Sequence, residues 1–302
     1  MGKVKLTFLG TGTSQGIPII GCGCKVCKSC DAKDKRLRSA ALVECNGLSV
    51  LIDAGPDFRY QMIRENIKHL DAILLTHNHM DHIGGLDDVR SFNYIDRKPA
   101  MIFCEEKVLD SLKVFYSYAF AEKKYPGAPE WRIRVIENKP FLIFPNNVGE
   151  LVWVHDFGYC DRQADGTIVP CGNDIVKKAV TAEGLSCTED AVQAIPIRGY
   201  HDKMPVLGFR FGDIAYITDM SMIPDDELLK LKGLKHLTLN TVSYKPHHSH
   251  FSLSEAVELA RKIGAEHTWL THLSHNFPKH EEFVSELPEG ISPAYDGLVI
   301  ED

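Results

Sequence analysis

The segment "HNHMDH" places three histidines and one aspartate within six positions, namely His77, His79, Asp81 and His82. Neutral imidazoles and a carboxylate suit zinc, manganese or iron. His77 and His79 are two residues apart and can face one metal ion, while Asp81 and His82 are displaced toward a second. Two metal ions about 3.5 to 4 Å apart can hold a hydroxide between them and neutralise an oxyanion. The segment therefore predicts a dinuclear metal centre and hydrolytic chemistry.

A second cluster of metal-binding residue types is "CGCKVCKSC", which contains Cys22, Cys24, Cys27 and Cys30. The chain begins without the apolar core of an export signal, so its cysteines are expected to be reduced thiols or metal ligands rather than disulfides. Four thiols at such short spacing are typical of a metal site.

Composition limits the class of protein. The chain has 302 residues, of which 44% are hydrophobic and 25% charged, which predicts an ordinary soluble globular protein. No segment approaches the roughly 20 apolar residues that cross a bilayer, so a cytoplasmic protein without membrane contact is expected. A net charge of −7 argues against a broad grip on long nucleic acid, and leaves small anionic substrates open.

Alternating hydrophobic patterns predict the elements that position these residues in the first half. Strands are expected at 4–10, 39–45, 48–55, 71–76 and 100–104, with Asn46-Gly47 as a hairpin turn. Residues 57–67 have a helical period, and 82–92 resemble the start of another helix. The segment "FYSYAFAEKKYPGAPEW" has no clean period. We expect one domain over residues 1–302, with an insertion within 116–190.

The second half repeats the alternation of strands and helices. Strands are expected at 192–201, 206–211, 214–219, 234–242 and 267–275, and a short helix at 224–233. Ser252 and Glu255 have capping-box spacing at the start of a helix that closes on Gly264. Histidines recur at strand ends, where a rigid sheet could support a metal site.

The segment "THNHMDHIGG", together with "FLGTGTSQG" and "LIDAGPD", resembles the metallo-β-lactamase superfamily. That resemblance implies an α/β fold, an αββα four-layer sandwich with the metal pair at one edge. It also implies that His77, His79 and His201 bind one metal ion, that Asp81, His82 and His272 bind the other, and that Asp219 bridges them. Asp53 would orient a ligand histidine through a hydrogen bond.

Within the superfamily, the early "GCGCKVC" resembles the phosphoribosyl 1,2-cyclic phosphate phosphodiesterases of phosphonate metabolism. The resemblance implies one structural zinc held by Cys22, Cys24, Cys27 and His275. Cys30 is the rival fourth ligand, because it follows Cys27 in C-x-x-C spacing.

The segment "HHSHFSLSEA" resembles the place where this subgroup and the tRNA 3′-processing nucleases put a histidine facing the scissile phosphate. His250 is the preferred candidate, His248 is second, and His247 is expected to face solvent. Such a histidine could protonate the leaving oxygen or stabilise the transition state. β-Lactam hydrolases would have no need of it.

The expected function is therefore a metal-dependent phosphodiesterase, in which His250 and Asp81 are essential and a hydroxide held by two divalent ions attacks a small phosphodiester, cyclic phosphate or nucleotide. The ions could be manganese, zinc or iron. Alternatives are a thioester or lactam hydrolase, a tRNA 3′-processing type of nuclease, and a non-catalytic accessory protein in redox-cofactor biosynthesis. The resemblance also suggests a homodimer.

Overall fold

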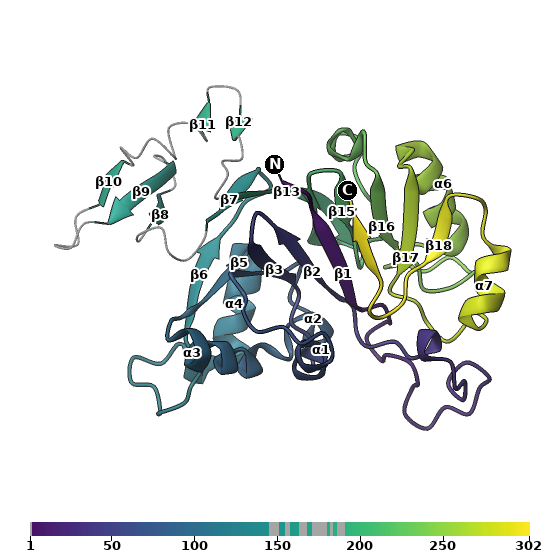
Figure 1. The fold of residues 1–302 in the computed structure, drawn as a ribbon, viewed down its shortest axis with the longest axis horizontal. Helices are drawn as coiled ribbons and strands as arrows, with labels where there is room; N and C mark the ends of the chain where they lie inside the picture. The colour runs from purple at the N-terminus through teal and green to yellow at the C-terminus, as the bar shows by residue number, and fades with distance from the viewer. Residues whose placement is uncertain are drawn as a thin grey trace.

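The computed structural model describes residues 2–144 and 191–302, and between them the backbone of five short strands. Two large sheets organise the described residues (Figure 1). In the order of strand pairing, the first sheet contains β19 (Val299–Glu301), β1 (Lys5–Gly10), β2 (Ala40–Cys45), β3 (Leu48–Ile52), β4 (Ala72–Leu74), β5 (Ala100–Cys104) and β6 (Trp131–Val135). The second contains β18 (Ile291–Pro293), β17 (His267–Thr271), β16 (His236–Asn240), β15 (Ile214–Tyr216), β14 (Met204–Phe211), β13 (Val192–His201) and β7 (Phe141–Ile143).

Helices cover the outer face of each sheet (Figure 1). The first sheet is covered by α1 (Phe58–Arg64), α2 (Met80–Ile83), α3 (Arg90–Asp96) and α4 (Glu106–Phe115), with 3-10 turns η2 (Leu86–Val89) and η3 (Ser117–Ala119). The second is covered by α6 (Leu253–Ile263) and α7 (His280–Glu286), with η4 (Glu227–Leu231); η1 (Ala32–Asp34) lies in the N-terminal loop. The predicted αββα sandwich is confirmed.

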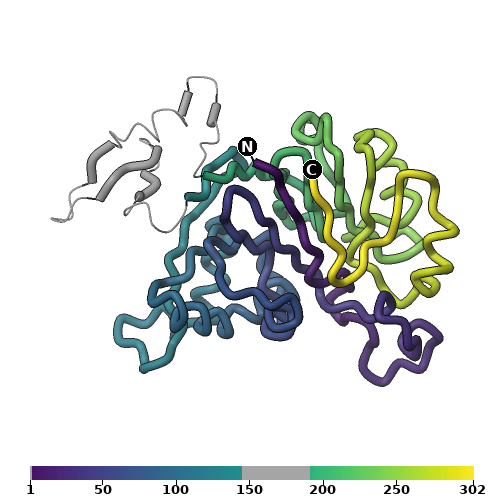
Figure 2. The backbone as a smooth tube through the Cα atoms, viewed as in Figure 1, coloured from purple at the N-terminus to yellow at the C-terminus, as the bar shows by residue number. Residues whose placement is uncertain are grey.

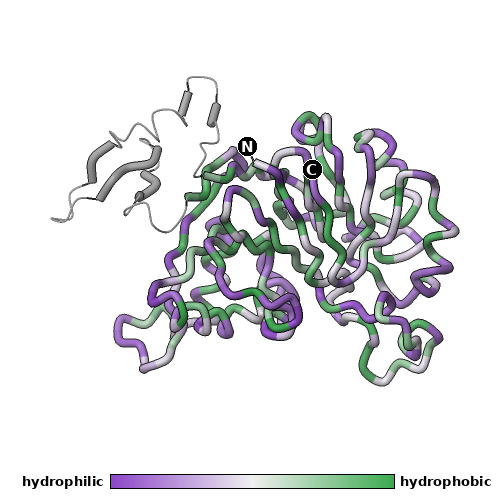
Figure 3. The backbone as a smooth tube through the Cα atoms, in the orientation of Figure 1, coloured by the Kyte–Doolittle hydropathy of each residue, from purple (hydrophilic) through white to green (hydrophobic). Residues whose placement is uncertain are grey.

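The main core lies between the two sheets. Phe8 of β1 and Tyr216 of β15 are both buried there, with ring centroids 6.3 Å apart. Figure 3 shows hydrophobic residues along strands of both sheets and many hydrophilic residues along the outer helices. Separate apolar clusters fill the space between each sheet and its helices. The two ends of the chain meet in one sheet, because β19 pairs antiparallel with β1 (Figure 2).

Several local predictions are confirmed. Asn46 and Gly47 have positive φ angles of 51° and 77° between β2 and β3, as a tight hairpin requires. Ser252 and Glu255 form both hydrogen bonds of the capping box at the start of α6. Gly264 ends the helix in the left-handed conformation, with φ at 71°.

Two helical predictions were wrong in detail. The helix expected over 82–92 begins at Met80 as α2, stops at the glycine pair, and continues as η2 and α3. The Gly85 backbone N–H donates to the Ala54 carbonyl at 2.8 Å and not to a carbonyl of its own helix, and a Cβ at Gly85 would lie 2.1 Å from the Gly55 carbonyl oxygen, so only glycine fits where the helix breaks. The short helix expected over 224–233 is the 3-10 turn η4.

The described elements bring several strand ends to one edge. β3, β4 and β5 are parallel, as are β15, β16 and β17, so the loops after these strands gather there. The backbone N–H of Leu207 in β14 donates to the Thr76 carbonyl at 3.1 Å, which joins the two sheets beside the histidine segment.

The expected insertion within 116–190 lies largely outside the described residues. Its first part supplies β6 and β7, which are edge strands of the two large sheets. Farther along, β8 (Leu151–Val154), β9 (Gly158–Arg162) and β10 (Ile168–Pro170) form a small sheet, and β11 (Val180–Thr181) pairs with β12 (Gly184–Leu185). In the described part of the chain, no helix combines the length and apolar character needed to cross a membrane.

Candidate metal centre

The histidine segment follows β4 at the edge where the parallel strands end. His77 lies in the loop and His79 is the N-cap of α2. Asp81 and His82 lie within the single turn of that helix. His77 and His82 are buried, with 1% and 0% exposure. A short helix directly after a loop thus turns all these side chains toward the second sheet.

The second sheet contributes three residues from its strand ends. His201 ends β13, Asp219 follows β15, and His272 follows β17. Asp219 and His272 both have a φ of 56°, and Asp53, after β3, has a φ of 64°. Residues with side chains rarely adopt this left-handed conformation, and strained backbone of this kind gathers at functional sites.

The side chains converge around Asp219. Asp219 belongs to three groups of potential ligands, and the ligand atoms within each group lie within 4.8 Å of one another. The other members are His77 and His82 in the first group, Asp81 and His272 in the second, and His201 and His250 in the third. A central carboxylate shared by several groups is what a bridging ligand requires. The His79 ring lies 4.6 Å from that of His77 and 4.9 Å from that of His201.

Hydrogen bonds fix the tautomer of the two histidines on the first sheet. The Thr76 hydroxyl donates to Asp53 Oδ2 at 2.8 Å and lies 2.9 Å from His77 Nδ1. Because the hydroxyl proton is committed to Asp53, His77 must donate through Nδ1–H. His82 Nδ1 lies 2.7 Å from the same Asp53 oxygen and donates to it. In the neutral form that a metal ion requires, both rings therefore have their free lone pair on Nε2.

The second sheet repeats this arrangement with different partners. His201 Nδ1 donates to the Asp219 carbonyl at 3.1 Å. The Ser39 hydroxyl donates to the Gly12 carbonyl at 3.0 Å and lies 3.0 Å from His272 Nδ1, so His272 donates to it. Asp53 makes the hydrogen bond to His82 that its expected orienting role requires. Ser39 and Thr76 were missed in the sequence: Thr76 directly precedes His77, but no sequence signal marks Ser39.

This geometry suits metal binding. The Nε2 atoms of His77 and His82 are buried and have no hydrogen-bond partner. His82 Nε2 lies 3.1 Å from Asp219 Oδ2 and 3.2 Å from Asp81 Oδ2, so one imidazole nitrogen and two carboxylates face a common point. Buried lone pairs of this kind are costly unless a cation binds them. The residues present therefore fit the divalent metal ions that this fold implies.

The electrostatics of the centre also favour a cation. Burial opposes a charge on His82, but Asp219, Asp81 and Asp53 outweigh it and raise the His82 pKa well above its usual value. Burial likewise opposes ionisation of Asp219, yet His272 and His82 hold its pKa well below the usual range. The carboxylates are thus poised to balance positive charge at the centre.

His250 lies beside the centre. Its ring centroid is 4.5 Å from that of His201 and 4.9 Å from that of His272, and 13% of its side chain is exposed. Burial, followed by the charge of His272, lowers the pKa of His250 to about 3. His247 and His248 are exposed, but His247 is closer to the site than expected, with its ring 5.2 Å from that of His250.

The cysteine cluster forms a separate group with His275. The Sγ atoms of Cys22, Cys24 and Cys27 lie 3.3, 3.6 and 3.7 Å from His275 Nδ1. The backbone N–H of Cys27 lowers the pKa of Cys24 to about 6, which favours a thiolate. Cys30 is exposed and lies outside this group. Three sulfurs and one imidazole match the donor set of a closed zinc site.

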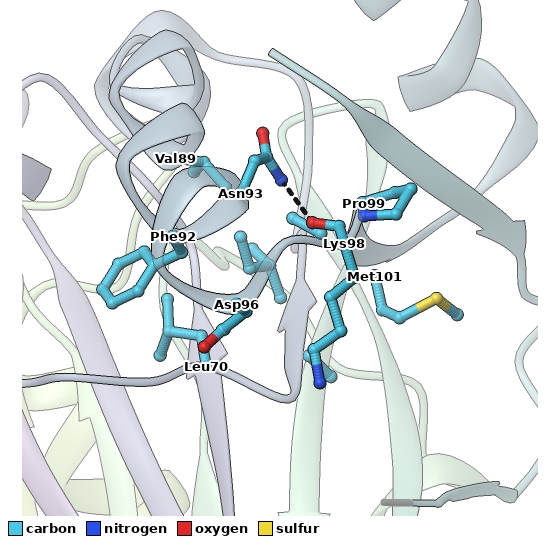
Figure 4. A pocket seen from close by; sticks show the side chains of 11 residues that line it. Leu70, Val89, Phe92, Asn93, Asp96, Lys98, Pro99 and Met101 are labelled. Carbon is cyan, nitrogen blue, oxygen red and sulfur yellow. Dashed lines mark hydrogen bonds between the residues drawn. The ribbon is translucent and has the colours of Figure 1, made fainter. Parts of the chain in front are cut away.

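A pocket elsewhere in the molecule is not a candidate active site (Figure 4). It lies under α3 at the opposite ends of β4 and β5, between Leu70, Phe92 and Met101. Its polar side chains are already bonded, since Asn93 donates to the carbonyl of Lys98 at 3.0 Å and His69 lies 2.8 Å from Asp96. This pocket has the character of a gap in packing.

Comparison with known proteins is consistent with the geometry. Residues 49–149 and 156–273 match the sequence model of the β-lactamase superfamily domain. A crystal structure described as a new diphosphatase from the PhnP family superposes with a TM-score of 0.78 at 36% identity, covering 99% of this chain and 97% of that one. The short form of human tRNase Z superposes with a TM-score of 0.60 at 18% identity over 98% of both chains, which shows a shared fold.

Among curated proteins, an octanoyltransferase of Porphyromonas gingivalis is 35% identical over 297 residues, which are 98% of this chain and 51% of that protein. This chain thus spans about half the length of that relative. A ribonuclease Z of Lachnoclostridium phytofermentans is 26% identical over 292 residues, covering 84% of this chain and 87% of the relative.

Proposed function

The chain belongs to the metallo-β-lactamase superfamily and has its hydrolase fold, and we propose that it is a metal-dependent phosphodiesterase of small phosphodiesters, cyclic phosphates or nucleotides. The observation that carries this proposal is the place of His250, beside His201 and His272 at the edge of the candidate centre. The likeness to a diphosphatase at 36% identity over nearly the whole chain supports it.

Two divalent ions would be held by the side chains at this edge. His77, His79 and His201 would bind one ion, Asp81, His82 and His272 the other, and Asp219 would bridge them. When bound, such ions supply Lewis acidity and a water of lowered pKa. Hydrogen bonds at Nδ1 would keep the histidines oriented. Asp53 accepts the Nδ1 proton of His82 and also the hydroxyl proton of Thr76. Ser39 accepts the Nδ1 proton of His272.

His250 would contact the substrate. Its lowered pKa makes it neutral near pH 7, so it acts as an N–H donor and not as a ready source of a proton. A neutral donor facing the phosphoryl group would stabilise the negative charge that develops on its oxygens in the transition state. Stabilisation of the transition state is one of the two roles expected for this histidine, and protonation of the leaving oxygen is the other.

A separate zinc ion would be structural. Cys22, Cys24, Cys27 and His275 leave no open position for a substrate. Leu273 and the N-terminal segment are also joined by backbone hydrogen bonds, since Leu273 donates to Thr11 at 2.8 Å and Thr13 donates to Leu273 at 3.3 Å. The ion would therefore fasten the N-terminal loop to the segment that carries His272.

Acyl chemistry is the second candidate, because of the likeness to an octanoyltransferase. The match occupies only half of that protein, so the likeness does not assign octanoyl transfer to the matched half. His250 distinguishes the two candidates, since a thioester hydrolase of this fold would have no role for a phosphate-facing histidine.

The decisive experiment is hydrolysis of bis(p-nitrophenyl) phosphate by metal-reconstituted protein, with an octanoyl thioester as the control substrate. We expect diester turnover that is lost in both His250→Ala and Asp81→Asn. Thioester turnover that survives His250→Ala, with no diester turnover by the wild type, would overturn the proposal.

A further inference from the structure

Four histidine rings form a continuous row from the centre to the surface. His201, a candidate ligand, has its ring centroid 4.5 Å from that of His250; His250 lies 5.2 Å from His247, and His247 lies 4.6 Å from His248. His250 is largely buried, whereas the outer rings of His247 and His248 are exposed. The proposed mechanism uses only the inner two rings.

The loop that carries the outer rings is held at both ends. Val242 donates to Phe251 at 3.3 Å, Phe251 donates to Met220 at 3.0 Å, and Leu253 donates to Ser243 at 2.9 Å. Met220 directly follows the candidate bridging residue Asp219. The position of this loop is therefore tied to the centre, although its tip is exposed.

The ring of His247 is also oriented within the loop. The backbone N–H of the buried Ser249 donates to His247 Nδ1 at 3.4 Å, and the Ser249 hydroxyl lies 3.2 Å from the same atom. Nδ1 therefore accepts, which places the proton of the neutral ring on Nε2. Among the described residues, that Nε2–H has no hydrogen-bond partner.

An oriented N–H donor one ring farther out than His250 suits an anionic group bound next to the scissile phosphate. We propose that His247, with His248 outside it, contacts a second phosphoryl group of the substrate and makes the enzyme prefer diphosphate esters over esters with a single phosphate. This inference rests on the proposed phosphodiesterase function and specifies its substrate class. A histidine that served only as a solvated surface residue would need neither the hydrogen bond from Ser249 nor the contact with His250.

The test compares two substrates that differ by one phosphoryl group, the methyl ester of AMP and the methyl ester of ADP. In His247→Ala we expect KM for the ADP ester to rise about tenfold, which corresponds to about 1.4 kcal/mol, with kcat within about twofold. Both constants for the AMP ester should stay within about twofold. His248→Ala should show a smaller change of the same kind.

Two further variants make the result specific. His247→Gln keeps an N–H donor and should restore part of the KM for the ADP ester. His69→Gln removes a half-buried histidine at the opposite ends of the strands and should change neither substrate's constants.

Equal effects of His247→Ala on the two esters, or no effect on either, would overturn this inference and leave the phosphodiesterase proposal standing. Absence of turnover of both esters by the metal-loaded wild type would instead overturn the proposed function, and the inference with it.

Discussion

Ser39 Oγ lies 3.0 Å from His272 Nδ1 while its own proton goes to the Gly12 carbonyl. The two residues are 233 positions apart in the chain, and His272 is buried in a left-handed backbone conformation. A serine with one committed proton can only accept from the ring, so it places the proton of the neutral imidazole on Nδ1 and leaves the lone pair on Nε2.

Removing this hydroxyl should weaken metal binding. In Ser39→Ala, His272 loses the acceptor that fixes its tautomer, and we expect affinity for one metal ion to fall about ten- to a hundredfold. Metal titration followed by calorimetry would measure it. Ser49→Ala, on β3, is the matched control and should bind metal normally. Unchanged affinity in Ser39→Ala would mean that Asp219, 3.2 Å from His272 Nδ1, orients the ring alone.

Asp81→Asn should remove one metal ion per chain. Asp81 lies beside His82, and the charge of that ring helps to keep the pKa of Asp81 below its usual range despite burial, so it is a carboxylate at neutral pH. An amide has no negative charge to balance the cation. Elemental analysis should find one ion fewer, turnover should vanish, and the circular dichroism spectrum should be unchanged. A variant with wild-type rate would contradict the two-metal assignment.

His250→Ala separates a substrate contact from a ligand. If His250 stabilises the transition state, kcat should fall about a hundred- to a thousandfold with metal content unchanged. His250 also lies in one group with His201 and Asp219, within 4.8 Å. A variant that loses a metal ion together with its activity would therefore identify His250 as a ligand.

The cysteine site can be tested without any substrate. Cys24→Ser should lower zinc content and the Tm, because the thiolates and His275 join the N-terminal loop to the second sheet. Cys30→Ser is the matched control, since Cys30 is exposed and outside the group. The same loss of zinc in Cys30→Ser would favour the rival ligand set with Cys30.

His69 should make stability depend on pH. Burial opposes its charge, but hydrogen bonds to Asp71 and Asp96, at 2.9 and 2.8 Å, outweigh that and raise its pKa. The folded state then binds the proton more tightly than the unfolded state. The stabilisation is fully present below the unfolded pKa of about 6.5 and is lost as pH rises through the folded pKa.

Urea denaturation of the wild type and His69→Gln across this range would measure the effect. The difference in unfolding free energy between the two proteins should shrink as pH rises. A difference that is constant with pH would show that His69 contributes no titrating charge.

Local features of this protein follow from its sequence because neighbouring residues decide them. Backbone preferences and short-range hydrogen bonds decide the Asn46-Gly47 hairpin, the Ser252 cap and the strand before His77. The four residues of the histidine segment share one loop and one short helix, so they lie close together once that segment folds. The break at Gly84-Gly85 could not be foreseen, because there the Gly85 N–H bonds to the carbonyl of Ala54, which is distant in the sequence.

The sequence by itself determined the types of the candidate ligands, their order along the chain and, through resemblance, the αββα fold that the structure confirms. Only the tertiary structure decided that His275 and not Cys30 meets the three cysteines, that Ser39 and Thr76 orient the imidazoles, and that His247 adjoins His250. Those contacts join residues on different strands and loops. Their distances depend on how two sheets pack, which no spacing within a single segment records.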